Sequence, residues 1–409
     1  MNPFIIPEYP DLFQDVPFSF DRNYKTRIDS QIKKGQPSPE MLSADPIRIN
    51  IPGAPISAAY YAPDGTPLQA PSDGPVLMPG QTPADGRYFT EIGSAHIEAF
   101  LKKGTRDYLY VFPDGARTRN EGRDLAPLPS FLRWSWYYYT AASVLCLEDP
   151  MYYTYSDLKL GWFYGTAEED YTEYCAMLVR HIAGLLHIPL THIILYGPSG
   201  GGHVAVSMSA FLPGSMAVSV NGQYDITRHF YYLEGHFTGI TGISGDNPGG
   251  LARNRTAEII REHSENRYLL ICNMLSEQDF DNQLQQLCGK LGVVPEYGLK
   301  TIGNLTVWLI DAPGVPEPHN SWENEIQFRM IDILLANLIN GCTAQDCRQY
   351  CYLITRFWKE RYESLAKIRN LETALKSRPE AVPSRLSGLF RRIAVKLKTL
   401  AKTSEKPKR

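Results

Sequence analysis

Apolar residues occur in short uninterrupted runs along the middle of the chain, and stretches with helical spacing separate these runs. Runs without polar alternation are typical of parallel strands that are buried on both faces. Strands that alternate with helices in this way predict an α/β fold with a doubly wound, mostly parallel sheet. The predicted strands are residues 107–112, 143–147, 192–196, 216–220, 268–272 and 305–310, and the predicted helices are 89–103, 168–187, 201–211, 279–292 and 321–340.

The predicted α/β unit, residues 76–340, is flanked by two segments with other patterns. Residues 1–75 are rich in Pro, Gly and Asp and contain strand-like runs at 47–51 and 57–61, which predict an irregular β-rich region. Residues 341–377 hold one long polar helix with few apolar positions. We expect a helical C-terminal extension with a solvated outer face, and a helical hairpin or coiled-coil partner is the alternative.

The tail, residues 378–409, has a third pattern. It holds ten Lys and Arg residues and two acidic ones, whereas the whole chain has a formal net charge of −3. Apolar residues recur at helical spacing within it, which predicts a basic amphipathic helix. Such a helix suits an anionic membrane surface, and we expect residues 384–401 to make that contact. A tail without structure, or a helix docked on its own protein, is the alternative.

Charge and composition narrow the classes of protein that fit. The 41 basic and 44 acidic residues argue against a nucleic-acid partner. No uncharged apolar run of about 18 residues occurs, and the first residues lack the basic and apolar regions of a secretory signal. We therefore expect a cytoplasmic protein, peripheral at the inner membrane face if the tail binds lipid. The seven cysteines are scattered and suggest reduced, buried thiols, with neither a metal site nor a cofactor.

The sharpest chemical signal is the segment Gly197-Pro-Ser199-Gly-Gly201. It follows an apolar strand and opens a helix, which is the context that the G-x-S-x-G nucleophile elbow requires. Small residues two before and two after the serine allow the tight turn. A phosphate-binding turn is the alternative, but the segment lacks the lysine of a P-loop and the spacing of a dinucleotide fingerprint. We therefore expect Ser199 to be a nucleophile.

A serine nucleophile needs a base and an acid. In the fold that carries this elbow, they follow it along the chain in the order serine, acid, histidine. His319 lies after the last predicted strand and before a helix, where the base belongs. The other histidines precede the serine, share its helix or precede the last strand. The acid should follow the preceding strand, where Asp279 is the first choice and Asp281 and Glu277 are the alternatives.

Acyl transfer also needs two backbone N–H donors for the oxyanion of its intermediate. One donor should be Gly200, the residue after the nucleophile. The other should lie in the turn after an early strand, and Ala116 occupies such a turn. Asn221 and Gln223 follow a later strand and reach the same edge of the sheet. We expect these two residues, together with Arg117, to bind the substrate.

Several of these segments resemble a family of α/β-hydrolase-like proteins that are encoded in capsule and surface-glycan loci. A more distant similarity is to the glycan O-acetyltransferase component of the accessory Sec system. The resemblance implies an α/β-hydrolase fold and acyl chemistry on a sugar, either O-acetylation or deacetylation. The segments that carry it are Gly115–Arg117, Glu148–Pro150, Gly161–Gly165, Gly197–Gly202, Pro213–Ser215 and Val220–Gln223.

Two functional hypotheses follow. The first is a serine acyl-esterase or O-acyltransferase that forms an acyl-enzyme on Ser199 and acts on a surface glycan or a glycolipid precursor, with an acyl donor as a further partner. The alternative is a non-catalytic α/β-hydrolase-like assembly factor of a membrane-associated glycan-synthesis machine, since this fold is also used for binding. A peptidase or lipase fits the predicted triad as well.

Overall fold

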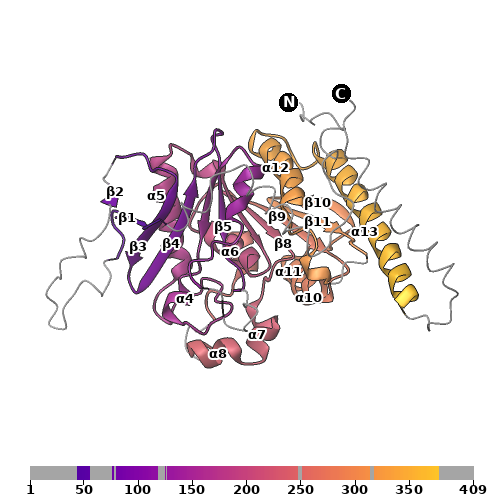
Figure 1. Ribbon diagram of the computed structural model, residues 1–409, viewed down its shortest axis with the longest axis horizontal. Helices are drawn as coiled ribbons and strands as arrows, with labels where there is room; N and C mark the ends of the chain where they lie inside the picture. Colours follow the sequence, from indigo (N-terminus) through magenta and orange to yellow (C-terminus); the bar gives the residue numbers. More distant parts are fainter. Residues whose placement is uncertain are drawn as a thin grey trace.

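The computed structural model describes residues 44–55, 76–77, 80–117, 125, 127–246, 251–313 and 317–376. Within them, eleven strands form a sheet in the order β10-β11-β9-β8-β7-β5-β6-β4-β3-β1-β2 (Figure 1). The strands are β1 (Ile47–Ile49), β2 (Val76–Leu77), β3 (Gly86–Ile92), β4 (Ala95–Lys102), β5 (Leu109–Pro113), β6 (Ser143–Leu147), β7 (Ile193–Pro198), β8 (Met216–Val220), β9 (Arg267–Asn273), β10 (Gly298–Ile302) and β11 (Leu305–Ile310).

The sheet is mostly parallel. Strands β4 and β10 run antiparallel to their neighbours, and the other pairings in the sheet are parallel. The six apolar runs of the sequence coincide with β5, β6, β7, β8, β9 and β11, with ends that differ by at most two residues. The run at 57–61 and the tail with its expected membrane contact at 384–401 lie outside the described residues.

One predicted helix is wrong. Residues 89–103, expected to be helical, instead belong to the antiparallel pair β3 and β4. Ile92 pairs with Ala95, so Gly93 and Ser94 form a two-residue hairpin turn, and Gly93 has the positive φ of 56° that such turns require. Burial alternates along β3, with a period of two residues rather than 3.6. The Gly-Ser pair was the available signal against a continuous helix.

Each face of the sheet carries its own apolar core. In β5, Leu109 and Val111 join one core, while Tyr110 and Phe112 join the other. Helices α4–α9 and α11 contribute to the first core, and α12 and α13 contribute to the second. The helices are α4 (Met151–Thr154), α5 (Tyr171–Leu185), α6 (Gly200–Ser209), α7 (Phe230–Leu233), α8 (His236–Thr241), α9 (Thr256–Glu262), α10 (Glu277–Asp279), α11 (Gln285–Leu291), α12 (Glu325–Ile339) and α13 (Arg348–Lys376).

Parallel pairing brings the carboxyl ends of the central strands to one edge of the sheet. The segments that follow β5, β7, β8, β9 and β11 therefore meet there, although they are far apart in the sequence. The serine turn follows β7, α10 follows β9, and a 3₁₀ turn at Pro318–Asn320 follows β11. This edge is where the predicted catalytic residues converge.

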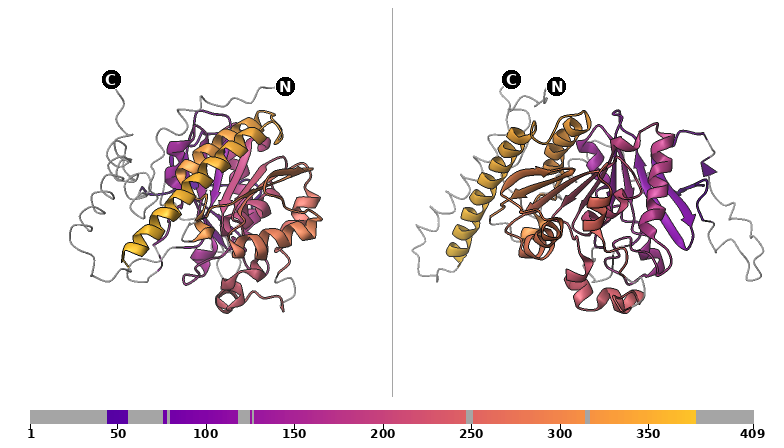
Figure 2. Two further views of the ribbon diagram at one scale, coloured as in Figure 1. Left: turned by 90° about the vertical axis from the view of Figure 1, so that its right-hand side faces the viewer. Right: turned by 180° about the vertical axis from the view of Figure 1, so that it is seen from behind.

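Helix α13 packs on the sheet through its first half. Figures 1 and 2 place it beside β10 and β11, at the opposite end of the molecule from β1 and β2. Ile354 and Trp358 are fully buried in the second core, and the Trp308 indole of β11 donates to Thr355 Oγ1 at 2.9 Å. Among the described helices, none is long and apolar enough to cross a membrane.

The burial of α13 predicts an asymmetry between two of its aromatic residues. Trp358→Ala should lower the free energy of unfolding by about 3–5 kcal/mol, because it empties a large buried volume. Tyr352→Ala, on the same helix at a position that is 58% exposed, should change it by less than about 0.5 kcal/mol. Urea denaturation followed by tryptophan fluorescence and circular dichroism measures both, and equal effects would contradict the packing described for α13.

Candidate active site

Ser199 occupies a tight turn between β7 and α6. Its backbone has φ 55° and ψ −126°, a conformation that non-glycine residues rarely adopt. A Cβ atom on Gly197 would lie 1.9 Å from the carbonyl oxygen of Gly201, so the turn closes only with glycine at position 197. The turn holds Ser199 at the carboxyl edge of the sheet and at the N-terminus of α6, where developing negative charge is stabilised.

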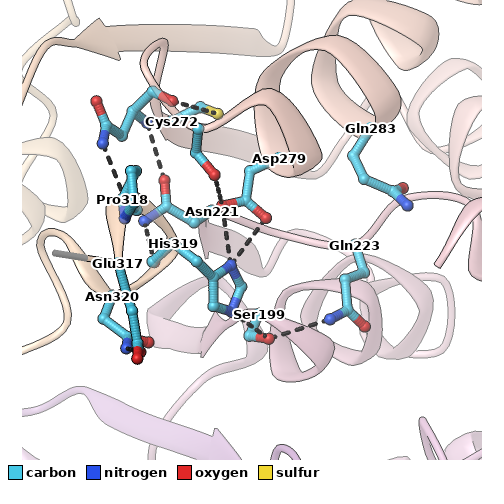
Figure 3. Close-up of polar contacts among 12 residues, drawn as sticks. Ser199, Asn221, Gln223, Cys272, Asp279, Gln283, Glu317, Pro318, His319 and Asn320 are labelled. Atoms are coloured by element: carbon cyan, nitrogen blue, oxygen red, sulfur yellow. Dashed lines mark hydrogen bonds and ion pairs between the residues drawn. The ribbon is translucent and has the colours of Figure 1, made fainter. Parts of the chain in front are cut away.

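The structure brings Ser199, His319 and Asp279 into one hydrogen-bonded chain (Figure 3). His319 Nε2 lies 2.9 Å from Ser199 Oγ, and His319 Nδ1 lies 2.8 Å from both carboxylate oxygens of Asp279. In the described residues, neither Asp281 nor Glu277 forms a hydrogen bond or ion pair with His319. Of the three candidate acids, the geometry therefore selects Asp279.

Asp279 is held in place by its own partners. Its side chain is fully buried, and Ser276 Oγ donates to Oδ2 at 2.6 Å. Burial alone lowers the pKa of His319, but the hydrogen bond and the negative charge of Asp279, with the charges of Glu323 and Glu317, outweigh it and raise the pKa to about 9. Asp279 thus stabilises the imidazolium, which is the form that a histidine base takes after it accepts a proton.

The two expected oxyanion donors, Gly200 and Ala116, lie in segments that border Ser199 or its cavity. Gly200 is the first residue of α6, where a backbone N–H has no partner within the helix. Ala116 lies on the wall of the cavity that contains Ser199. Among the backbone hydrogen bonds of the described residues, none has the Ala116 N–H as its donor. A Cβ atom on Gly200 would lie 2.7 Å from Leu160 Cδ1, so a side chain there would displace the cavity wall.

Asn221 does not occupy a substrate-binding position, contrary to expectation. Its side chain is fully buried, and its Nδ2 donates to the carbonyl oxygens of His319 at 2.8 Å and Ser321 at 2.7 Å. Its Oδ1 accepts from the backbone N–H of Asn273 at 2.8 Å. In turn, Asn273 Nδ2 donates to the carbonyl of Pro318 at 3.0 Å. Both amides hold the turn that carries His319, so Asn221 is better described as a positioning residue.

Arg117 also lies away from the cavity. Its guanidinium is buried, donates to the carbonyl of Ser156 at 2.8 Å and lies over the ring of Tyr152 at 5.2 Å. This placement corrects the expectation that Arg117 binds substrate. Gln223, in contrast, lines the cavity, and its Nε2 donates to Ser199 Oγ at 3.1 Å.

The cavity beside Ser199 has a volume of about 710 Å³. Sequence reasoning missed several of its polar residues, among them Lys159, His229, Gln278 and Glu317. Burial, together with the positive charges of His319 and Lys159, lowers the pKa of His229 to about 4, so this second histidine is neutral at pH 7. The wall is formed by Ala116, Lys159, Leu160, Ser199, Gln223, His229, Phe230, Tyr231, Leu275, Ser276, Glu277, Gln278, Glu317, Pro318 and His319.

A metal site does not accompany the cavity in the described part of the chain, where no group of three or more His, Cys, Asp or Glu side chains could hold an ion. The clustered cysteines 342, 347 and 351 are buried free thiols that belong to or border the second core.

Comparison with protein-family models gives no match, and neither does comparison with curated proteins. Among solved structures, the chain is similar to the capsule O-acetyltransferase of Neisseria meningitidis serogroup A, with 14% identity and a TM-score of 0.42 over 61% of this chain and 96% of that one. It is also similar to a chain of the Glycosylation Associate Protein (Gap123) complex from Streptococcus agalactiae, with 13% identity and a TM-score of 0.43 over 62% of this chain and 46% of that chain.

A third similar structure is EstE7, a homologue of HSL from a metagenome library, with 14% identity and a TM-score of 0.36 over 64% of this chain and 87% of that one. The distant similarity to capsule and glycosylation proteins that the sequence led us to expect is thus present. At this distance, the function has to be inferred from the residues of the site.

If Asn221 positions the His319 turn through its hydrogen bonds, replacing it with an apolar side chain of similar size should destabilise the protein. Asn221→Leu should lower the free energy of unfolding by at least about 2 kcal/mol, since each buried backbone group that loses its partner costs about 1–3 kcal/mol. Asn320→Ala, an exposed amide beside His319, should change it by less than about 0.5 kcal/mol. Urea denaturation measures the difference, and equal stability of Asn221→Leu and the unsubstituted protein would refute the positioning role.

Proposed function

We propose that this protein is a serine acyl-esterase or O-acyltransferase that acts on a surface glycan or a glycan precursor through an acyl-enzyme on Ser199. The observation that carries the proposal is the continuous chain from Ser199 Oγ through both ring nitrogens of His319 to the buried carboxylate of Asp279, with distances of 2.9 and 2.8 Å. A nucleophile within hydrogen-bond reach of a base, which a third group orients, is the arrangement of nucleophilic catalysis. This alignment favours an enzyme over a non-catalytic assembly factor.

In the proposed reaction, a lone pair of Ser199 Oγ attacks the carbonyl carbon of an acyl donor or ester. The Oγ–H proton moves to His319 Nε2, and the π electron pair of the carbonyl moves to its oxygen, for which Gly200 and Ala116 are the expected donors. The bond to the leaving oxygen or sulfur then breaks, and His319 returns the proton to that atom. Water or a sugar hydroxyl takes the place of the leaving group and releases the acyl group by the same steps in reverse.

The lining of the cavity supports a sugar as the other reactant. A volume of about 710 Å³ is within the range of cavities that hold small molecules, and it exceeds what a short acyl group alone would fill. The carboxylates of Glu277 and Glu317 and the ammonium of Lys159 belong to residues of its wall. Carboxylates accept hydrogen bonds from hydroxyl groups, and an ammonium donates to their oxygens. An oxygen-rich sugar ring therefore has suitable partners in the cavity.

A fluorophosphonate probe and p-nitrophenyl acetate test the acyl-enzyme directly. We expect labelling and burst release of p-nitrophenol by the unsubstituted protein, loss of both in Ser199→Ala, and loss of turnover in His319→Ala. Gln278→Ala, on the cavity wall but outside the hydrogen-bonded chain, should still be labelled. A folded unsubstituted protein that neither takes the label nor turns over the ester would overturn the proposal and favour the assembly factor.

The pKa of His319 predicts the pH dependence of the reaction. His319 acts as a base only when it is neutral, and its pKa is about 9, so kcat/KM should rise with pH through that region. Asp279→Asn removes the main cause that raises this pKa, while burial still lowers it. The rise should therefore move to lower pH in this variant, and the plateau should fall because the imidazolium loses its partner.

Stopped-flow hydrolysis of p-nitrophenyl acetate from pH 5 to 10, with the rate of Ser199→Ala subtracted as background, measures both effects. An unchanged midpoint in Asp279→Asn would show that another group titrates.

A further inference from the structure

Ser199 Oγ is contacted from two sides. His319 Nε2 lies on one side at 2.9 Å, and Gln223 Nε2 donates from the other at 3.1 Å (Figure 3). A hydroxyl group has one proton to donate and lone pairs to accept, so both contacts can form at once. The general description of a serine, histidine and acid chain assigns no role to the second contact, and Gln223 is only 2% exposed.

The orientation of the Gln223 amide is fixed by a neighbour that can only donate. The Trp162 indole Nε1–H donates to Gln223 Oε1 at 2.6 Å, which leaves the NH₂ group facing Ser199. An indole nitrogen has no acceptor lone pair, so a flipped amide would set two donors against each other. The direction of the Gln223 to Ser199 hydrogen bond therefore follows from chemistry.

Trp162 is itself held in a strained conformation. Trp162 and Phe163 both have a φ of 54°, which is unfavourable for bulky side chains. Both are buried, and the N–H of Phe163 donates to the buried carboxylate of Asp149 at 3.0 Å. Strain of this kind persists where surrounding contacts enforce it, and it concentrates at functional sites. Here it places the indole N–H against Gln223.

We propose that Gln223 is a catalytic residue that supplies a third, side-chain donor to the oxyanion, and that Trp162 is its positioning residue. This inference rests on the proposed acyl-enzyme function. When Oγ forms its bond to the carbonyl carbon, it becomes an ester oxygen and loses its value as an acceptor. The oxyanion appears on the same carbon, two bonds from Oγ, as the carbonyl electron pair moves to it. Gln223 Nε2–H then transfers its hydrogen bond from Oγ to the oxyanion.

The position of Gly200 supports this transfer. A Cβ atom on Gly200 would lie 3.5 Å from Gln223 Oε1 and 3.5 Å from Trp162 Cδ1, so the amide and the indole lie beside the residue that supplies an expected backbone donor. The hydrogen bond to neutral Oγ in the resting state becomes a bond to a full negative charge. Charge-assisted hydrogen bonds are stronger, so Gln223 would stabilise the transition state more than the ground state.

The test compares Gln223→Leu and Gln223→Glu with the unsubstituted protein. Leucine removes the donor, and glutamate keeps the shape while replacing the NH₂ group with oxygen. We expect the acylation rate constant for p-nitrophenyl acetate to fall by about 10²–10³, which is the usual loss when one oxyanion donor is removed. KM should change little, and inhibition by a trifluoromethyl ketone, which forms a tetrahedral adduct on serine, should weaken in proportion to the loss in rate.

Gln278→Glu is the matched control for Gln223→Glu. Gln278 lines the same cavity, and its substitution adds the same charge without a hydrogen bond to Ser199 in the described structure. We expect its acylation rate to fall far less than that of Gln223→Glu. Equal losses in the two variants would attribute the effect to the charge of the cavity and overturn the donor role.

Trp162→Phe tests the positioning role. It keeps an aromatic ring but removes the N–H that orients the amide, so it should lower the acylation rate with little change in KM. Combined with Gln223→Leu, it should cause almost no further loss, because the residue that it orients is gone. Additive losses would instead indicate an unrelated structural effect of Trp162.

The outcomes separate this inference from the proposed function. If the unsubstituted protein and all Gln223 variants take the fluorophosphonate label and acylate at rates within about threefold, Ser199 is a nucleophile but Gln223 is not an oxyanion donor. A faster Gln223→Leu variant would likewise overturn the inference, since it would mean that the amide only restrains the resting serine. If the unsubstituted protein takes no label, the proposed function itself fails.

Discussion

The carboxamide of Asn221 joins three segments that are far apart in the sequence. Asn221 directly follows β8. Its side chain accepts a hydrogen bond from the backbone N–H of Asn273, the last residue of β9, and donates to the turn that carries His319. The carboxyl ends of parallel strands meet at one edge of a sheet, but the loops that follow them keep fixed relative positions only if contacts connect them. The Asn221 amide links these loops: it donates to the backbone carbonyl of His319, the residue whose ring nitrogen lies 2.9 Å from Ser199 Oγ.

Several residues in and around the site have strained backbone conformations. Ser199, Asn221, Trp162 and Phe163 all have positive φ angles between 47° and 55°, and each is a residue other than glycine. Such conformations cost on the order of 1–3 kcal/mol each and survive only where neighbouring contacts enforce them. The buried cores on both faces of the sheet provide that enforcement. The packing of both cores therefore holds these backbone conformations and the polar side chains that they carry.

The sequence was sufficient to predict the strands of the central sheet and the residues that meet at its edge. Uninterrupted apolar runs mark buried parallel strands, and the fixed order of serine, acid and histidine limits the candidates to a few positions. The choice of Asp279 over Asp281 and Glu277 required coordinates. The segment after β9 is helical, and side chains two residues apart on a helix point to nearly opposite sides. The hairpin at 86–102 was missed because its two strands together have the length of a helix.

The roles of Asn221 and Arg117 could not be predicted from the sequence for a related reason. A polar residue after a strand reaches the edge of the sheet in either case, and the sequence does not indicate whether its side chain meets solvent or a backbone carbonyl. His229 was set aside because of its place in the chain order, yet it forms part of the cavity wall. The order of segments along the sequence thus identifies the candidate nucleophile, base and acid. The residues that position them or line the cavity become visible only in the folded structure, because their contacts depend on tertiary packing.

All seven cysteines of the chain are buried as free thiols, and burial raises the pKa of Cys146, Cys175 and Cys272 well above its ordinary value. A thiol that is both inaccessible and protonated reacts slowly with electrophiles. Two cysteines engineered at exposed positions of the cavity wall, Phe230 and Leu275, would therefore react with a maleimide dye or spin label much faster than the seven native thiols. The distance between the two labels could then be measured without first replacing any native cysteine of the core.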